Sequence, residues 1–297
     1  SSEGSEDIQE ENKTLINASV LGLIFEKING YRDGSFFTPG FITMYMARES
    51  IKMAVLEKFN SRYGWKCEDY TQLHNKIDNI QEANEIVNSL KICDPAAGSG
   101  HFLVSVLNEI IAVKSELGIL CDREGKELRY YKVKGVNDEL IIKDDDHNIF
   151  VYKLGSREAQ RVQEAIFHEK QTIIENCLFG VDINPNSVKI CRLRLWIELL
   201  KNAYYTKESN YRYMETLPNI DINIKKGNSL ISKFDLHDTK LSRRDKRNLA
   251  DYKKYVDHYK NAANRDFKRE YKKNIDRIQT QFKGIFEGQT RKQKRLV

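Results

Sequence analysis

The stretch Lys91-Ile92-Cys93-Asp94-Pro95-Ala96-Ala97-Gly98-Ser99-Gly100-His101-Phe102-Leu103 decides the fold of this chain. Apolar residues and an acid lead into a glycine-rich turn and then into an apolar helical pattern, which predicts a strand, a tight loop and a helix start. Gly98 and Gly100 can adopt positive φ and let a ligand approach the backbone. The helix start offers unpaired N–H groups to a negative charge. We therefore expect a small ligand with an anionic group here.

The residues of this loop argue against two common ligand classes. A dinucleotide fingerprint reads G-x-G-x-x-G and a P-loop reads G-x-x-x-x-G-K-[ST], and neither string occurs in the sequence. A nicotinamide-dependent oxidoreductase is therefore disfavoured.

Length and composition restrict the class of protein. The chain has 297 residues, enough for one large domain or two smaller ones. It has no apolar run that could span a bilayer and no signal-peptide pattern, so we expect a cytoplasmic protein. Its five cysteines are widely spaced and form no C-x-x-C, which argues against structural zinc. The first residue is Ser, so we expect a piece of a longer protein.

Charge is distributed unevenly along the chain. Residues 233–297 hold about 20 Lys and Arg against about 9 Asp and Glu, whereas the whole chain has a net charge of +6. The body is therefore acidic to neutral and carries a basic tail. Such asymmetry is expected where a polyanion lies along one side, although solvated helical faces produce similar runs. We favour nucleic-acid contact by this tail.

The N-terminal part of the chain reads as helical. Apolar spacing predicts helices over 13–29 and from Pro39 to about Phe59, with Thr38 as N-cap and Pro39 as the first helical residue. Residues 60–88 read as a loop and a polar helix. A strand over 89–93 and a helix over 101–116 flank the glycine loop.

A change of pattern over about 125–154 predicts a small inserted antiparallel meander. Its three β-rich runs are Leu128–Val133, Leu140–Ile142 and Ile149–Tyr152. The acidic cluster Asp144–Asp146 could suggest a metal site, but a solvated tight turn explains it better, and we expect no metal.

The remaining segments alternate between helix and strand. We expect a helix over 156–176, a buried strand over 178–183, and a helix capped by Asn184 that continues through Leu200. Residues 220–224 alternate like a strand, and the chain is polar with helical spacing from about 237.

This alternation predicts an α/β fold with a parallel, helix-covered sheet. Three parts follow: a helical segment over 1–88, a core over 89–232 that contains the meander, and a basic helical segment over 233–297.

Asp182 is expected at the carboxyl end of its strand, where ligands bind in an open α/β sheet. A carboxylate there can accept hydrogen bonds from two ribose hydroxyls. Its separation from Gly100 is far beyond the usual spacing of about 20 residues, so the spacing gives no support of its own.

Four segments together resemble a known family. Asp94–Leu103 resembles motif I of the amino-methylating DNA methyltransferases, and Phe179–Pro185 followed by Leu193–Trp196 matches the same pattern. Gly227-Asn228 stands where the family often has Asp, and Phe37-Thr38-Pro39 resembles motif X. Over about residues 15–232 the chain is most similar to adenine-N6 DNA methyltransferases of fused restriction-modification enzymes. Phage-defence methylases and separate modification subunits are close rivals.

The resemblance implies a Rossmann-like methyltransferase fold with an incomplete sheet, and S-adenosylmethionine as cofactor. It assigns the motif I loop to the methionine part of the cofactor, Asp182 to the ribose hydroxyls, and Asn228 to the adenine amino group. In motif X, the Thr38 hydroxyl and the loop backbone hold the cofactor carboxylate. The implied cofactor residues are Phe37, Thr38, Asp94, Pro95, Ala96, Gly98, Ser99, Gly100, Asp182, Ile183 and Asn228.

One element of the family pattern is missing. The family's catalytic loop reads Asn/Asp-Pro-Pro-aromatic, but the prolines here are Pro39, Pro95, Pro185 and Pro218, and no two are adjacent. We therefore expect no catalytic residue in this chain, a fragment that binds cofactor and does not methylate alone, and a loop that lies beyond Val297.

The expected partners are double-stranded DNA and nuclease and target-recognition domains elsewhere in the same polypeptide or complex. The alternative is a non-catalytic S-adenosylmethionine-binding module that regulates a nuclease assembly.

Overall fold

The computed structural model describes residues 22–28, 38–136, 139–218, 220–230, 243–262 and 265–293. The chain divides into two compact units, Ser1–Gly227 and Asn228–Val297. The described residues begin with a helix over 22–28, which is part of the helix predicted over 13–29. Phe37, a predicted cofactor residue, lies outside the described residues.

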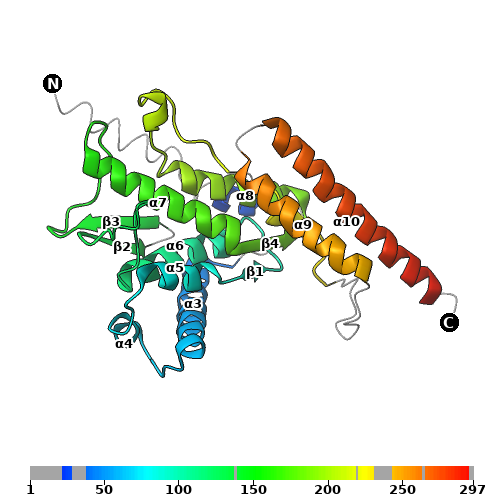
Figure 1. Cartoon of the computed structure of the whole chain (residues 1–297), viewed down its shortest axis with the longest axis horizontal. Coiled ribbons are helices and arrows are strands. Elements are labelled where there is room, and N and C mark those ends of the chain that lie inside the picture. Colours follow the sequence, from blue (N-terminus) through cyan, green and yellow to red (C-terminus); the bar gives the residue numbers. More distant parts are fainter. Residues whose placement is uncertain are drawn as a thin grey trace. The chain divides into compact units, whose positions relative to one another are not determined.

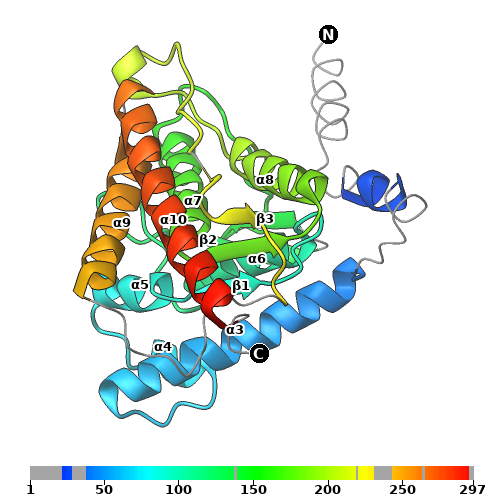
Figure 2. The same ribbon diagram turned by 90° about the vertical axis from the view of Figure 1, so that its right-hand side faces the viewer.

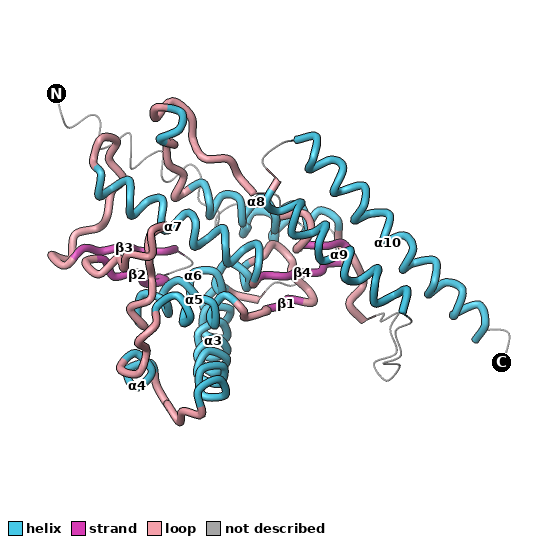
Figure 3. Tube along the Cα trace, in the orientation of Figure 1, coloured by secondary structure: helices cyan, strands magenta, loops and turns pink. Residues whose placement is uncertain are grey.

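A small parallel sheet forms the centre of the first unit (Figure 1). Within the described residues it contains β1 (Ile92–Asp94), β4 (Leu178–Asp182) and β5 (Ile224–Lys226) in the order β1-β4-β5. Cys93 pairs with Phe179, and Val181 pairs with Lys225. The strands are short beside the helices (Figure 3). The chain is therefore a mixed α/β protein with parallel strands, as the alternation of patterns predicts.

Helices surround this sheet. They are α3 (Gly40–Tyr63), α4 (Tyr70–His74), α5 (Ile80–Asn88), α6 (His101–Glu116), α7 (Arg157–Asn176) and α8 (Pro185–Leu200), with a short 3-10 turn at Lys207–Ser209. Helix α6 contacts α3, α5, α7, α8 and β4, and its Leu103, Leu107 and Ile110 are fully buried. Helices α4 and α5 lie against α3 (Figure 2). Within the described residues, no helix is long and apolar enough to cross a membrane.

In its described residues the second unit contains two helices, α9 (Arg243–Asn261) and α10 (Arg265–Gln293), which pack against each other. Tyr259, Ile275 and Ile278 are buried. Over the described residues from 243 the predicted polar helical pattern therefore does form helices, and buried apolar positions on both helices hold them together.

The predicted meander is a two-stranded hairpin. Strands β2 (Tyr131–Val136) and β3 (Glu139–Asp144) pair antiparallel. The third run, Ile149–Tyr152, is not a strand and joins β3 through one bridge between Lys143 and Ile149. The Phe150 amide donates to the Ile142 carbonyl at 2.9 Å, and the Tyr152 hydroxyl donates to Gln160 Oε1 at 2.5 Å, which ties the end of the run to α7.

The start of α3 differs by one residue from the prediction. Pro39, not Thr38, is the N-cap residue, with φ −57° and ψ 144°, and Gly40 is the first helical residue. The extended ψ of Pro39 keeps it outside the helix, while its carbonyl accepts hydrogen bonds from the amides of Ile42 and Thr43. The helix also runs one turn beyond Phe59, to Tyr63.

The strand predicted over 220–224 begins only at Ile224. The preceding residues form a turn because Asn223 Nδ2 donates to the carbonyls of Ile174, Glu175 and Leu178 at 2.8–2.9 Å. The alternation of Ile and polar residues reflects this buried turn, not a strand. In contrast, Asn184 caps α8 as predicted, accepting from the Asn186 amide at 2.9 Å with Pro185 at the first helical position.

A buried ion pair joins α7 to α8. Lys170 Nζ donates to the Glu198 carbonyl at 2.8 Å and lies 3.3 Å from Glu198 Oε2, with both side chains about 1% exposed. Burial lowers the pKa of Lys170. Burial alone would raise the pKa of Glu198, but the charges of Lys170 and Lys201 outweigh it and lower that pKa. The charge of Lys170 therefore stabilises the Glu198 carboxylate, and the charge of Glu198 opposes the effect of burial on Lys170.

Replacing Glu198 with Gln should lower the free energy of unfolding by about 3 kcal/mol, because the Lys170 ammonium would remain buried without a countercharge. Urea unfolding followed by circular dichroism measures this. The matched control is Glu208→Gln at an exposed position, which should stay within about 0.5 kcal/mol of the wild type. Equal stability of the two variants would contradict the prediction.

Candidate functional site

The glycine loop leaves the carboxyl end of β1 and is fixed by backbone contacts to β4. Asp94 Oδ1 accepts a hydrogen bond from the Ala96 amide at 2.9 Å. The Ala97 amide then donates to the Val181 carbonyl at 2.9 Å. Pro95 and Ala96 are exposed, while Ala97 is buried. The loop therefore exposes Pro95 and Ala96 to solvent, while Ala97 packs against the protein interior.

The two predicted glycines of the loop adopt the backbone conformation that glycine favours. Gly98 has φ +53° and Gly100 has φ +87°. Gly100 is the N-cap of α6, and its carbonyl accepts from the Val104 amide at 3.0 Å. A Cβ at Gly100 would lie 2.8 Å from Cys191 Sγ. Burial raises the pKa of the Cys191 thiol to about 12, so this thiol is a neutral packing group.

Asp182 lies at the end of β4 and connects three segments. Its Oδ2 accepts from the Gly98 amide at 2.8 Å, and its Oδ1 accepts from the Asn184 amide at 2.7 Å. Its backbone carbonyl accepts from the Gly227 amide at 2.9 Å. The structure therefore brings together the glycine loop, the start of α8 and the end of β5 around the acid that the sequence singles out.

A second carboxylate lies at the same edge of the sheet. Burial raises the pKa of Asp94, and the nearby charge of Asp182 raises it further, although the Ala96 amide acts in the opposite direction. Two half-buried carboxylates at one edge create a negative potential, which favours a cationic group of a ligand.

Ser99 differs from the other loop residues because its side chain points into the protein. It is 1% exposed, and its hydroxyl donates to Glu26 Oε1 at 2.6 Å. Arg194 Nη1 donates to the Ser99 carbonyl and hydroxyl oxygens, each at 3.3 Å. A role for Ser99 at the surface of the loop is therefore limited to its backbone.

The other predicted residues are placed as follows. Ile183, directly after Asp182, is 67% exposed. Thr38 is exposed beside the start of α3, and Phe37 lies outside the described residues. Asn228 belongs to the second unit, where its Oδ1 accepts from the Leu230 amide at 3.0 Å.

Three residues at the base of the loop were not predicted as site residues: Glu26, His101 and Arg194. Glu26 Oε1 lies 2.9 Å from His101 Nδ1, and Arg194 is fully buried. A signal existed in the sequence, since Arg194 stands in the apolar run Leu193–Trp196, where a buried charge requires a partner. Its partner could not be identified, because Ser99 is 95 residues away in the sequence.

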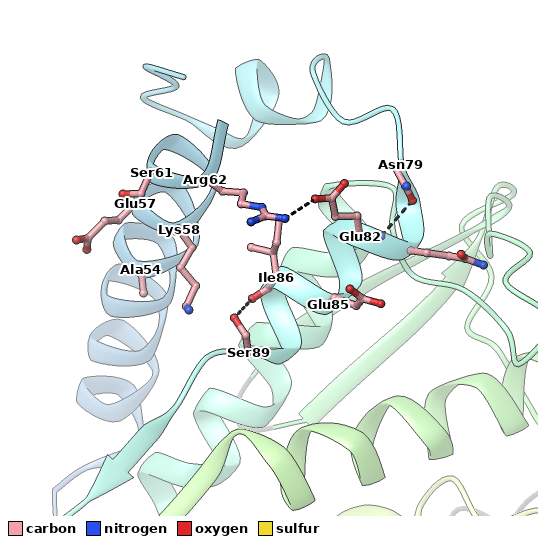
Figure 4. Close-up of a pocket in the computed structure, with 11 residues that line it drawn as sticks. Ala54, Glu57, Lys58, Ser61, Arg62, Asn79, Glu82, Glu85, Ile86 and Ser89 are labelled. Atoms are coloured by element: carbon pink, nitrogen blue, oxygen red, sulfur yellow. Dashed lines mark hydrogen bonds and ion pairs between the residues drawn. The ribbon is translucent and has the colours of Figure 1, made fainter. Parts of the chain in front are cut away.

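A separate groove of about 940 Å³ lies between α3 and α5 (Figure 4). Its lining is largely polar and charged, and an ion pair joins Arg62 to Glu82 across it at 3.4 Å. None of the predicted cofactor residues lines it. Among the described residues, no three His, Cys, Asp or Glu side chains are grouped so that they could hold a metal ion. Asp144 instead stabilises a turn by accepting from the Asn148 amide at 2.8 Å.

Comparison with known proteins matches residues 70–256 to the family described as MmeI, DNA-methyltransferase domain. The chain is 30% identical over 261 residues to a protein of Methanocaldococcus jannaschii named "Putative type II restriction enzyme and methyltransferase RM.MjaORFECS2P". It is 28% identical over 151 residues to the type II restriction enzyme and methyltransferase RM.Eco57I of Escherichia coli. These alignments cover 81% and 51% of this chain, but 18% and 12% of the relatives' own lengths.

Replacing Gly100 with Ala should lower the free energy of unfolding by about 1–2 kcal/mol from backbone strain and by about 1–3 kcal/mol more from the clash with Cys191. Urea unfolding measures the loss. Gly155→Ala is the matched control, because Gly155 has φ +91° and no atom within 4 Å of an added Cβ, and it should show only the strain.

Adding Cys191→Ala to Gly100→Ala should recover part of the second loss, since it removes the clashing sulfur. A Gly100→Ala variant as stable as Gly155→Ala would show that the loop is not held against Cys191.

Proposed function

The chain belongs to the family described as MmeI, DNA-methyltransferase domain, and we propose that it is the S-adenosylmethionine-binding part of a site-specific DNA adenine-N6 methyltransferase. The family is a methyltransferase domain of restriction-modification enzymes, and both curated relatives carry restriction and methyltransferase activities in their names. The enzyme as a whole would modify adenine in duplex DNA within a restriction-modification or phage-defence system.

One observation carries the proposal: the hydrogen bond from the Gly98 amide to Asp182 Oδ2 at 2.8 Å. It holds the glycine loop beside the acid at the carboxyl end of β4, where nucleotide ligands bind in open α/β sheets. Each carboxylate oxygen of Asp182 has a second lone pair, so it can accept from ribose hydroxyls while it keeps its bonds to Gly98 and Asn184. The exposed Ile183 side chain supplies an apolar surface next to that acid for the adenine ring.

The rest of the cofactor would be held by the loop and its surroundings. The backbone of Pro95, Ala96 and Gly98 borders the methionine part, and the start of α6 favours a carboxylate. Asp94 and Asp182 favour the positive charge of the sulfonium. When bound, S-adenosylmethionine supplies the methyl group on this sulfonium. Thr38 and Asn228 keep the roles that the resemblance assigns them, at the cofactor carboxylate and at the adenine amino group.

The target base would be handled by residues other than these. The four prolines of the sequence are never adjacent, so none of them forms an Asn/Asp-Pro-Pro-aromatic loop. We therefore assign cofactor binding to this chain and no catalytic residue for methyl transfer. The proposed substrate is double-stranded DNA, and a base inside a duplex must leave the stack before its amino group can be reached.

Helix α9 is our candidate for contact with that DNA. It has seven Lys and Arg against three Asp. Arg243, Arg247 and Lys254 are exposed and lie on one face, because they are four and seven residues apart. The opposite face packs on α10 through Tyr252, Tyr255 and Tyr259. With a rise of about 1.5 Å per residue, the three cations span roughly 16 Å, enough to reach several phosphates of one strand.

Replacing Asp182 with Asn should weaken S-adenosylmethionine binding by at least about 10-fold, because a lost charge-assisted hydrogen bond typically contributes about 1.5 kcal/mol or more. The Asn amide would also direct an N–H toward the Gly98 or Asn184 amide. Calorimetric titration measures the dissociation constant, with exposed Asp145→Asn as the matched control. A folded wild-type chain that does not bind S-adenosylmethionine, or an Asp182→Asn variant that binds as tightly as the control, would refute the assignment.

Replacing Arg243, Arg247 and Lys254 together with Gln should weaken binding to a DNA duplex and reduce the slope of log K against log salt by up to about 2.7, since each phosphate contact contributes about 0.9. Fluorescence anisotropy between about 50 and 200 mM salt measures both quantities. The control variant replaces Lys132, Lys134 and Lys143 with Gln. These residues are exposed on the β2–β3 hairpin, so the control changes the net charge by the same amount as the α9 variant. Equal salt slopes for the two variants would count against contact through α9.

A further inference from the structure

A buried polar network lies under the glycine loop and is not explained by direct contact with the cofactor. Glu26 Oε1 accepts from the Ser99 hydroxyl at 2.6 Å and lies 2.9 Å from His101 Nδ1. Arg194 Nη1 on α8 donates to the Ser99 carbonyl and hydroxyl oxygens at 3.3 Å. The network therefore joins the helix over 22–28, the loop and α8.

All four side chains of this network are shielded from water. The Glu26 and His101 side chains are 12% and 8% exposed, and Ser99 and Arg194 are 1% and 0% exposed. Burial alone would raise the pKa of Glu26, but the hydrogen bonds from His101 and Ser99 and the charge of Arg194 lower it. Glu26 is therefore a carboxylate near neutral pH and offsets the charge of the buried guanidinium, which cannot lose its proton.

The charge of Glu26 also fixes the direction of one hydrogen bond. A carboxylate only accepts hydrogen bonds, so Ser99 must direct its hydroxyl hydrogen at Glu26. His101 Nδ1 lies 2.9 Å from the same oxygen. Ser99 and His101 stand on either side of Gly100, the N-cap of α6. The Glu26 carboxylate thus contacts the residues on both sides of Gly100, where the loop ends and α6 begins.

The helix over 22–28 packs closely against α8. A Cβ at Gly22 would lie 2.8 Å from Arg194 Nη1, so the guanidinium packs against the backbone of the helix over 22–28. This contact places the helix that carries Glu26 against α8 and sets the distance from Glu26 to the loop.

We propose that Glu26 is a positioning residue of the cofactor site, which acts through Ser99 and His101 to preorganise the glycine loop, with Arg194 as its charge partner. The proposal rests on the proposed function, because the loop is there assigned to S-adenosylmethionine. Glu26 itself does not touch the cofactor. Its effect on affinity arises because a loop that is already ordered loses less conformational freedom on binding.

The test replaces Glu26 with Gln in the full chain and first measures amide hydrogen exchange without ligand. The reporters are the Ala97, Gly98 and Gly100 amides, which donate to Val181, Asp182 and Ala97. Their exchange should become at least about 10-fold faster, while exchange in α7 and α10 stays unchanged. Glu57→Gln, at an exposed position on α3, is the matched control and should exchange like the wild type. Glu26→Asp keeps the charge and should recover part of the protection.

Calorimetric titration with S-adenosylmethionine then measures binding, and Glu26→Gln should weaken it by about 10-fold through preorganisation. Combining Glu26→Gln with Ser99→Ala should add little to either single effect, because both variants remove the same contact. Unchanged loop exchange in Glu26→Gln, or faster exchange throughout the first unit, would overturn the positioning role. A wild-type chain that does not bind the cofactor would instead overturn the proposed function, and the ligand-free exchange data separate the two failures.

Discussion

The hydrogen bond between the Gly98 amide and the Asp182 carboxylate is the contact on which the rest of the first unit depends. Strands β1 and β4 are short, so the sheet alone fixes little of the loop that follows β1. Asp182 supplies the missing constraint by accepting from the Gly98 and Asn184 amides at 2.8 and 2.7 Å. One side chain therefore sets the path of the loop and the direction of α8, because both begin within hydrogen-bond reach of the same carboxylate.

Buried charge is the second organising feature of this unit. Lys170 with Glu198 and Lys114 with Glu169 are ion pairs in which at least one side chain is fully or almost fully buried, and Glu26 faces Arg194 under the loop. Such pairs contribute little net stability, since desolvation offsets their attraction. Their value lies in geometry: a misplaced helix would leave a buried charge without its partner. The pairs therefore favour one arrangement of the helices around the sheet.

Much of the local structure could be predicted from the sequence, because short-range signals decide it. Glycines in the loop, the Asn184 cap and Pro185 at the start of α8 act within a few residues of themselves. The predictions were wrong where distant contacts decide. Asn223 binds carbonyls about 45 to 49 residues away, which turns an alternating pattern into a buried turn. Likewise Glu26 and Ser99 are 73 residues apart, so no spacing rule could predict the hydrogen bond between them.

The separation of charge between the two units fits the two ligands of the proposed function. Asp94 and Asp182 form a negative edge that suits a cationic sulfonium, whereas a DNA duplex is a polyanion that such an edge would repel. A single surface could not favour both. In this chain the two carboxylates belong to the unit Ser1–Gly227 and the basic helices to the unit Asn228–Val297. Under the proposed function, attraction for DNA therefore has to come from a part of the chain other than the one that binds the cofactor.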